Sequence, residues 1–377
     1  MSAAPREARR AEALDSFRVR GMPHRRFEHW RYSDLRAVLD AGQVAQAGTA
    51  HWQIEGLPHG VETFDLAKDA APEWVAKNLG YIGNRPTMEE ASLAFADGGV
   101  ALRVSRGARI VEPVKLQVSH TGNLRVLVVL EEGASMTLFE LHTMDAGLVR
   151  NIGVELALAE GAELTHVRCA PTSPKSFLIE HIAVEAADQA HYIAHFANFG
   201  SRLSRTEVHI LLNGEGAEAH LTGVTVLGAE LHADVTSHVE HVAGKTLSTQ
   251  LFKHVAGGKA RAVYQGKITV REGANGSDSR QTAKALLMSG RAEADLKPEL
   301  IIFADDVKCA HGAAVGDLDA DSLFYLRSRG IPEREARKLL IHAFLEEAVA
   351  GIDDGALRDH VWRDVESALP RAMEAAK

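Results

Sequence analysis

The sequence predicts a mainly β protein: a parallel β-helix core over residues 91–315, between an N-terminal helical domain at 1–90 and a C-terminal helical domain at 316–377. Three observations support this division. Helix-type patterns are confined to the two ends of the chain, and short alternating strands fill the middle. Within that middle, turn-like positions recur about every 28 residues, which is the mark of a stacked repeat.

The N-terminal domain is predicted from two amphipathic stretches. EARRAEALDSF (7–17) and EHWRYSDLRAVLDA (28–41) carry Ala, Leu, Glu and Arg at helical spacing. Ser33 and Asp34 stand just before Leu35, where their side chains can cap a helix. We therefore expect both stretches to be helical.

The central segment has the pattern of consecutive strands. Its units are rich in Val, Ile and Leu, and each ends in Gly, Asn or an acidic residue. They are GGVALRVS, NLRVLVVLEE, NIGVELALAEG, FLIEHIAVEA, RTEVHILLNGEG and GKITVREG. No proline occurs from Lys175 to Lys297, so an uninterrupted sheet is permitted there. No helical stretches separate the strands, which argues against a doubly wound α/β fold.

A repeat in the sequence helps to choose between two all-β architectures. The corner residues are taken as Gly133, Gly161, Gln189, Gly216 and Gly244, spaced 28, 28, 27 and 28 residues apart. A β-helix whose coils stack on one another explains this period. A β-sandwich with evenly spaced hairpins remains the alternative. The β-helix is favoured because the hairpin signals Asn-Gly and Asp-Gly, such as those at 274–277 and 96–99, are scarce.

Helical signals return after Gly316. Asp319 or Asp321 can cap a helix over SLFYLRSR, and Gly330 is expected at the position just after the end of that helix. Pro332 is expected at the first position of the next helix, PEREARKLLIHAFLEEAVA. The apolar stripe of that helix is predicted to be Leu339, Leu340, Ala343, Phe344 and Ala348.

Composition excludes several classes of function. The 377 residues include 42 Lys and Arg against 51 Asp and Glu, a net charge of −9, which disfavours nucleic acid as a partner. No secretory signal and no apolar run of about 20 residues are seen, so a cytoplasmic protein without a membrane partner is expected. The two cysteines, Cys169 and Cys309, are too few for a disulfide framework.

Histidine is abundant, with 19 in the chain and ten between His166 and His254. The run HADVTSHVEH sets His232, His238 and His241 near Glu240. On a strand, His238 and Glu240 share one face while His241 takes the other, so the three histidines do not converge on one ion. We expect these histidines to be half-buried and satisfied by neighbouring coils. A stand-alone histidine-rich metal-binding β protein remains an alternative.

A carbohydrate-active β-helix enzyme is a second alternative, because paired carboxylates drive glycoside hydrolysis. Asp305 and Asp306 are the best pair, but adjacent strand residues point to opposite faces. The chain lacks the phosphate-binding motif G-x-x-x-x-G-K-[ST]. If ATP is used, another chain must bind it.

The segment DDVKCAHGA (305–313) is the densest group of reactive side chains. If it is extended, Cys309 and His311 share a face, about 6.5 to 7 Å apart. Thiolate and imidazole both suit iron or zinc, but a metal site needs three or four ligands. The pair is therefore either structural or half of a site that another chain completes.

A longer segment containing this pair, KPELIIFADDVKCAHGAAVGDLDADSLFYLRSRGIPEREARKLLIHAFLEEAV (297–349), resembles the C-terminal signature of the SufB/SufD family. These proteins are scaffold subunits of the SUF iron–sulfur cluster assembly machinery. SDSRQTAKALLMSGRAEADLKPEL and FEHWRYSDL extend the likeness over the whole chain. Gly312 stands where the SufB branch has an acidic residue, so the SufD branch is the better match.

The resemblance implies a right-handed β-helix and a scaffold with no catalysis of its own. It implies a complex with a SufB-like scaffold and a SufC-like ABC ATPase; a homodimer is the alternative pairing for the isolated chain. His311, and Cys309 with it, would ligate a transient iron–sulfur cluster at the SufB interface, with no permanently bound cofactor. The ATPase would dock on the C-terminal helices. The residues that we expect to contact it are Phe324, Tyr325, Arg329, Ile331, Arg334, Leu340 and Phe344.

Overall fold

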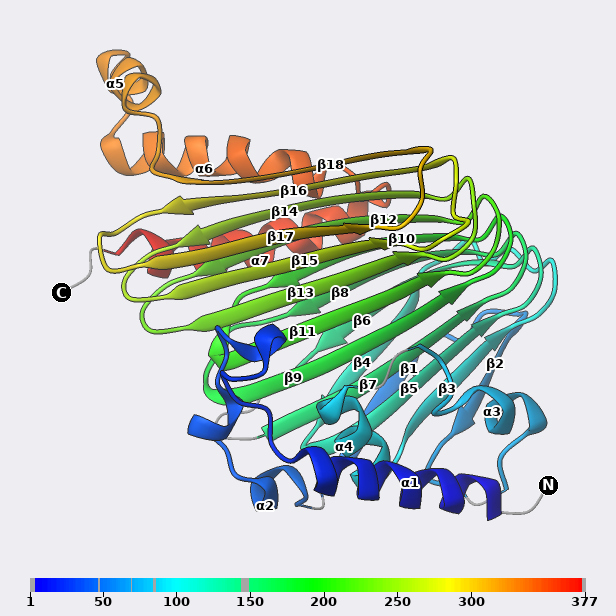
Figure 1. Ribbon diagram of the computed structural model, residues 1–377. Helices are drawn as coiled ribbons and strands as arrows, with labels where there is room; N and C mark the ends of the chain where they lie inside the picture. The colour runs from blue at the N-terminus through cyan, green and yellow to red at the C-terminus, as the bar shows by residue number, and fades with distance from the viewer. Residues whose placement is uncertain (1–3, 47, 69, 84–85, 144–148, 375–377) are drawn as a thin grey trace.

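The computed structural model describes residues 4–46, 48–68, 70–83, 86–143 and 149–374. Over these residues the chain winds into a β-solenoid of about eight turns, with helices at both ends (Figure 1). The predicted parallel β-helix is therefore confirmed. The β-sandwich alternative is wrong, because consecutive strands alternate between two parallel sheets instead of pairing as hairpins.

Each turn of the solenoid contributes one strand to each of two nine-stranded sheets. Sheet A has the order β1 (Ala50–Glu55), β4 (Val114–His120), β6 (Ser135–His142), β8 (Glu163–Ala170), β10 (His191–Asn198), β12 (Glu218–Leu227), β14 (Leu247–Ala256), β16 (Ser277–Leu287) and β18 (Val307–Gly316). Sheet B has the order β17 (Glu293–Ile302), β15 (Arg261–Val270), β13 (His232–His241), β11 (Ser201–Leu212), β9 (Ser173–Ala186), β7 (Val149–Leu158), β5 (Gly122–Leu130), β3 (Gly99–Val104) and β2 (Val61–Asp65). The pairs β1–β4 and β2–β3 are antiparallel.

The corners of successive coils are joined by backbone hydrogen bonds. The N–H of Gly161 donates to the carbonyl of Asp188 one coil further on, and Gln189 donates in the same way to Glu215. Four of the five predicted corners have the left-handed backbone that a tight corner requires: Gly133 (φ 65°), Gly161 (φ 64°), Gln189 (φ 55°) and Gly216 (φ 71°). The fifth prediction was one residue early: the left-handed residue is Lys245 (φ 56°), because this coil is longer than its predecessors.

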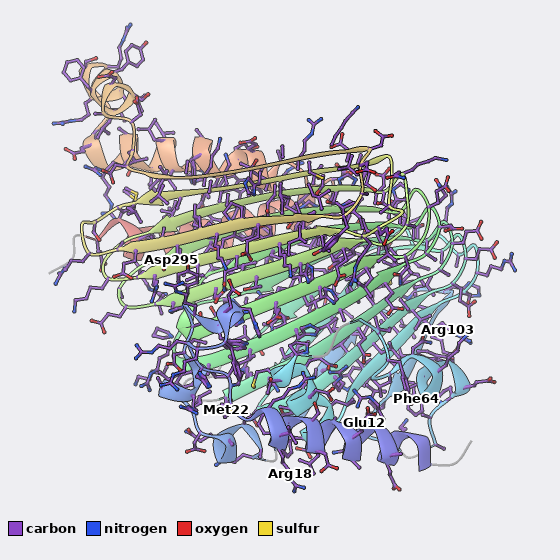
Figure 2. The ribbon with its side chains drawn as sticks, in the orientation of Figure 1. Glu12, Arg18, Met22, Phe64, Arg103 and Asp295 are labelled. Atoms are coloured by element: carbon purple, nitrogen blue, oxygen red, sulfur yellow. The ribbon has the colours of Figure 1, made fainter. Side chains whose placement is uncertain are left out.

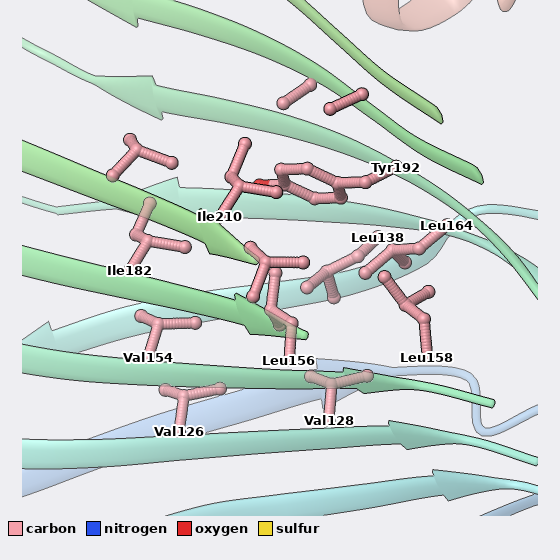
Figure 3. Packing of buried hydrophobic residues seen from close by; sticks show 14 of the residues in the cluster. Val126, Val128, Leu138, Val154, Leu156, Leu158, Leu164, Ile182, Tyr192 and Ile210 are labelled. Carbon is pink, nitrogen blue, oxygen red and sulfur yellow. The ribbon is translucent and has the colours of Figure 1, made fainter. Parts of the chain in front are cut away.

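The interior of the solenoid is filled by side chains that alternate along each strand. Figure 3 shows Val126, Val154 and Ile182 stacked along sheet B, and Leu138 and Leu164 of sheet A in the same buried cluster. These side chains are completely buried. Because each coil repeats the inward positions of the previous one, the core is a stack of aliphatic rows.

The N-terminal segment covers one end and part of the outer face of sheet B. It contains α1 (Ala4–Arg20), two 3₁₀ turns at Glu28–Trp30 and Leu35–Ala37, α2 (Ala41–Val44), α3 (Glu73–Asn78) and α4 (Thr87–Phe95), besides strands β1 and β2. The first predicted helix is confirmed, but the second is broken into the two 3₁₀ turns and α2. The reason is tertiary: the Ser33 hydroxyl donates to Asp234 (2.6 Å), and Trp30 packs on the Arg205 guanidinium (4.3 Å), which draws this stretch onto sheet B.

The C-terminal helices are α5 (Ala320–Ser328), α6 (Glu333–Val349) and α7 (Gly355–Met373). Asp319 caps α5, Gly330 follows its end with a positive φ, and Pro332 lies one residue before α6. The stripe predicted for α6 is right at Ala348 but rotated elsewhere. Ile341, Leu345 and Val349 join Ala348 in the cluster on sheet A, and Ala336 is also buried, while Leu339 and Ala343 are exposed. Within the described part of the chain, no helix combines the length and apolarity needed to cross a membrane.

Candidate functional site at the open end of the solenoid

The solenoid ends in two strands that have a neighbour on one side only. β18 is the last strand of sheet A and β17 the last of sheet B, and among the described residues nothing pairs with their outer edges. Figure 1 shows them at the end of the solenoid opposite α1. Their surroundings expose large apolar side chains: Ile301 (38%), Ile302 (41%), Phe303 (63%) and Val315 (47%). An apolar surface with two free strand edges is a template for another chain.

Cys309 and His311 both lie on β18, within this open end. The prediction that this segment is extended holds from Val307 onward. Cys309 is half-buried and packs against the cluster of Ile268, Val270 and Ala274, whereas His311 is exposed. Burial and the Asp278 carboxylate both raise the pKa of the Cys309 thiol, so it is a neutral thiol in the isolated chain.

Beneath these two residues the solenoid interior becomes polar. Cys309 is in register with Ser279, which hydrogen-bonds Ser248 (2.6 Å) one coil below. His311 is in register with Gln281. The amide nitrogen of Gln281 donates to the Tyr264 hydroxyl (2.8 Å). The last coils therefore place hydroxyl and amide groups under the strand that carries the two candidate ligands.

The acidic pair lies outside β18. Asp305 and Asp306 are exposed in the bend between β17 and β18, and the Asp306 carbonyl accepts the N–H of Gly276. The condition that the whole segment is extended is therefore met only from Val307 onward, and the acidic pair lies just before the strand. The strand begins at Val307 because Asp306 is used to close the corner.

The residues predicted to receive the ATPase divide into two groups. Phe324 (73% exposed) and Tyr325 (56%) project from α5, and Arg329 lies over the Tyr325 ring at 5.2 Å. Figure 2 shows the side chains of α5 projecting clear of the solenoid. Arg334 is also exposed.

The second group lies deeper. Ile331 and Leu340 are half-buried. Phe344 packs at the joint between α6 and the solenoid, with the Lys253 ammonium 4.8 Å from its ring centre. α5 and the start of α6 thus form the accessible part of the predicted surface, whereas Phe344 lies in the contact between α6 and the solenoid.

The strand histidines are mostly paired with neighbours, as expected. His195 hydrogen-bonds Thr222, His220 bonds Thr249, and His241 bonds Thr246 and Ser248. His238 and Glu240 do share a face. Sequence reasoning missed their third neighbour, His209, which lies beside His238 in the preceding coil. The coil period was the signal that could have identified it, because 29 residues separate His209 from His238.

Comparisons with known proteins agree with the family resemblance seen in the sequence. The family model described as "SUF system FeS cluster assembly, SufBD core domain" matches residues 115–344. The iron-sulfur cluster assembly protein SufD of Escherichia coli is 29% identical, over 93% of this chain and 90% of that protein. A SufBD family protein of Synechocystis is 33% identical over 66% of this chain and 56% of its own length, and SufD of Bacillus subtilis is 29% identical over 68% and 61%.

Proposed function

Because the chain belongs to the SufB/SufD family of the SUF iron–sulfur cluster assembly system, we propose that it is a scaffold subunit whose open solenoid end joins a SufB-like partner. The observation that carries this proposal is the pair of free edges on β17 and β18. A second solenoid can continue both sheets by adding its own strands, as in other cases of strand addition. The exposed Phe303 and Val315 would be buried in that joint.

His311 is the cluster ligand that this chain contributes. Its imidazole is exposed on the edge strand, so a ligand from a partner can approach the same point. Cys309 is the second candidate, but its half-buried, neutral thiol must lose its proton before it can bind iron. Two ligands leave a site incomplete. The cluster is therefore cargo held jointly with the partner scaffold.

The exposed face of α5 and the start of α6 is the docking surface for an ABC-type ATPase of the SufC kind. Two adjacent aromatic side chains, Phe324 and Tyr325, with Arg329 beside them, have the composition of an interface hot spot. α6 packs on β12 and β14 of sheet A, so a movement of this surface is transmitted to the coils that precede β18. ATP-driven dimerisation of the ATPase would thereby open or close the shared cluster site.

Co-expression with a SufB-like scaffold and its ATPase tests this function. We expect a complex to purify that contains all three chains, and the variant Val315→Asp to release the scaffold while keeping the ATPase. A variant that loses the ATPase but keeps the scaffold would contradict the proposed arrangement, and so would a wild-type chain that binds neither partner.

A further inference from the structure

We propose that His209, His238 and Glu240 form a binding site for a divalent transition-metal ion on the outer face of sheet B. The three side chains offer two imidazole nitrogens and one carboxylate oxygen, all within 4.8 Å of one another. The residues lie on β11 and β13, apart from the open end and its ligands. The inference stands independently of the role proposed for His311.

The solenoid repeat brings these groups together. His209 and His238 are register partners on adjacent parallel strands, and their ring centres are 4.9 Å apart. Val208 and Val239 face the core, so the two histidines and Glu240 face outward. Glu240 is two residues beyond His238 on the same strand face. Its Oε1 accepts from His209 Nε2 at 2.8 Å and lies 3.7 Å from His238 Nδ1. An ion would take the place of the proton between the His209 ring and this oxygen.

Further groups orient the ligands. His238 Nε2 is 3.0 Å from the Thr269 hydroxyl oxygen. If that hydroxyl accepts a hydrogen bond from the Nε2–H group, Nδ1 carries no proton and its lone pair is directed toward Glu240. Arg271 donates through Nε to the other carboxylate oxygen, Oε2, at 2.8 Å. Thr269 and Arg271 thus hold an imidazole and a carboxylate in the manner typical of the groups behind metal ligands.

The site is accessible from a cavity of about 520 Å³ between sheet B and the N-terminal segment. His238 lines this cavity together with Glu207 and Gln265 of sheet B and His29 and Thr87 of the N-terminal segment. The side chain of His238 is 23% exposed, whereas those of His209 and Glu240 are almost fully buried. An ion bound here would have three protein ligands on one side and room for water on the other.

The chemistry of the ligands selects the ion. Mg²⁺ and Ca²⁺ prefer all-oxygen sites, whereas two histidines and one carboxylate with open positions match Fe²⁺ and also accept Zn²⁺ and Co²⁺. Lys267, the register neighbour of His238 and also a lining residue, adds a positive charge nearby. We therefore expect an exchangeable ion with moderate affinity.

Two other groups of potential ligands lack this combination. Glu140, His142 and Glu180 are completely buried, and Glu180 is paired with Arg168 at 2.7 Å. In the other group, Cys169 is fully buried in the cluster beneath α7.

Anaerobic titration of the full-length chain with Co²⁺, followed by visible absorption, tests the site, and Fe²⁺ competition gives the affinity for iron. We expect one ion per chain for wild type and for His220→Gln, which alters a similar His–Glu pair on sheet A (2.9 Å). His238→Gln and Glu240→Gln should each abolish the visible absorption of bound Co²⁺. Thr269→Val should weaken binding roughly 10- to 100-fold, because it removes only the orienting hydroxyl.

A second set of variants locates the ion if it is elsewhere. The double variant Cys309→Ser/His311→Ala and the single variant Cys169→Ser should both keep the ion. The proposal is overturned if either of them loses it, or if His238→Gln, folded by circular dichroism, binds as wild type does.

Discussion

Gln281 on β16 lies in register with His311 on β18, and the carboxamide oxygen of Gln281 is buried without a hydrogen-bond partner among the described residues. Its amide nitrogen already donates to the Tyr264 hydroxyl. A buried oxygen without a donor is costly, and the register partner of Gln281 on the outer side is His311, whose ring can offer an N–H. An N–H donated to Gln281 would fix the tautomer of His311 and leave the other ring nitrogen for iron.

Replacing Gln281 by Leu should therefore weaken iron binding at His311 roughly 10- to 100-fold while leaving the chain folded. The measurement is the nitrogen chemical shifts of His311 by NMR together with the iron content of the scaffold complex. A merely structural role for Gln281 predicts a lower melting temperature with unchanged His311 tautomer. Gln281→Glu, which keeps an acceptor, should preserve the tautomer.

Phe303→Asp should weaken association with the SufB-like scaffold by about 2 kcal/mol or more, which is about 30-fold in Kd. The reason is that a charge would be carried into an apolar joint beside the free strand edges. Isothermal titration calorimetry of the purified scaffolds measures the effect. Val19→Asp is the matched control, because Val19 is 86% exposed on α1, at the opposite end of the solenoid. Equal affinities for the two variants would place the joint elsewhere.

Phe324→Ala and Tyr325→Ala should each weaken ATPase binding by about tenfold, because exposed aromatic side chains next to an arginine act as anchors. Neither residue supports the fold, since α5 has no buried residue. Surface plasmon resonance with immobilised ATPase is a suitable measurement. Substitution of Phe344 is a poorer probe, because Phe344 packs against the solenoid. Wild-type binding by the double variant would exclude α5 as the docking surface.

Stability should fall as the pH drops from about 6.5 to about 4. Burial lowers the pKa of His195 and His254 to about 4 each. Between that value and the unfolded pKa near 6.5, only the unfolded chain binds the proton, so each such histidine removes about 1.4 kcal/mol per pH unit as acidity rises. His142, whose pKa is raised despite its burial because Glu140 and Glu180 hydrogen-bond it, opposes this trend.

Chemical denaturation at pH 7.5 and pH 5 measures this dependence. His254→Phe should flatten the slope by about one proton, since both ring nitrogens of His254 are buried without partners among the described residues. The exposed His51, changed to Gln, should leave the slope as it is. An unchanged slope in His254→Phe would show that His254 is protonated in the folded chain.

Much of the fold could be predicted from the sequence because a solenoid repeats its local signals. The corner at Gly161 and the strand after it recur in each coil, so one period determines the architecture. The N-terminal stretch around Ser33 could not be predicted in this way. Its conformation depends on Asp234, about 200 residues later, and helical spacing carries no information about that contact.

The candidate site was predictable in part for the same reason. Alternation alone places Cys309 and His311 on one strand face. It does not reveal that β18 is the last strand, which determines whether His311 is buried or open to a partner. The register that brings His209 beside His238 depends on the length of each coil, and these lengths vary by a residue or more.

The most direct test of the shared-cluster proposal is His311→Ala in cells that depend on this system, with the activity of an iron–sulfur reporter enzyme as the readout. We expect the activity to be lost while the complex of scaffold, partner and ATPase still purifies intact. His311→Cys, which restores a ligand, should recover part of it, and Lys308→Ala on the same strand should behave as wild type. Full reporter activity with His311→Ala in an intact complex would contradict the proposal.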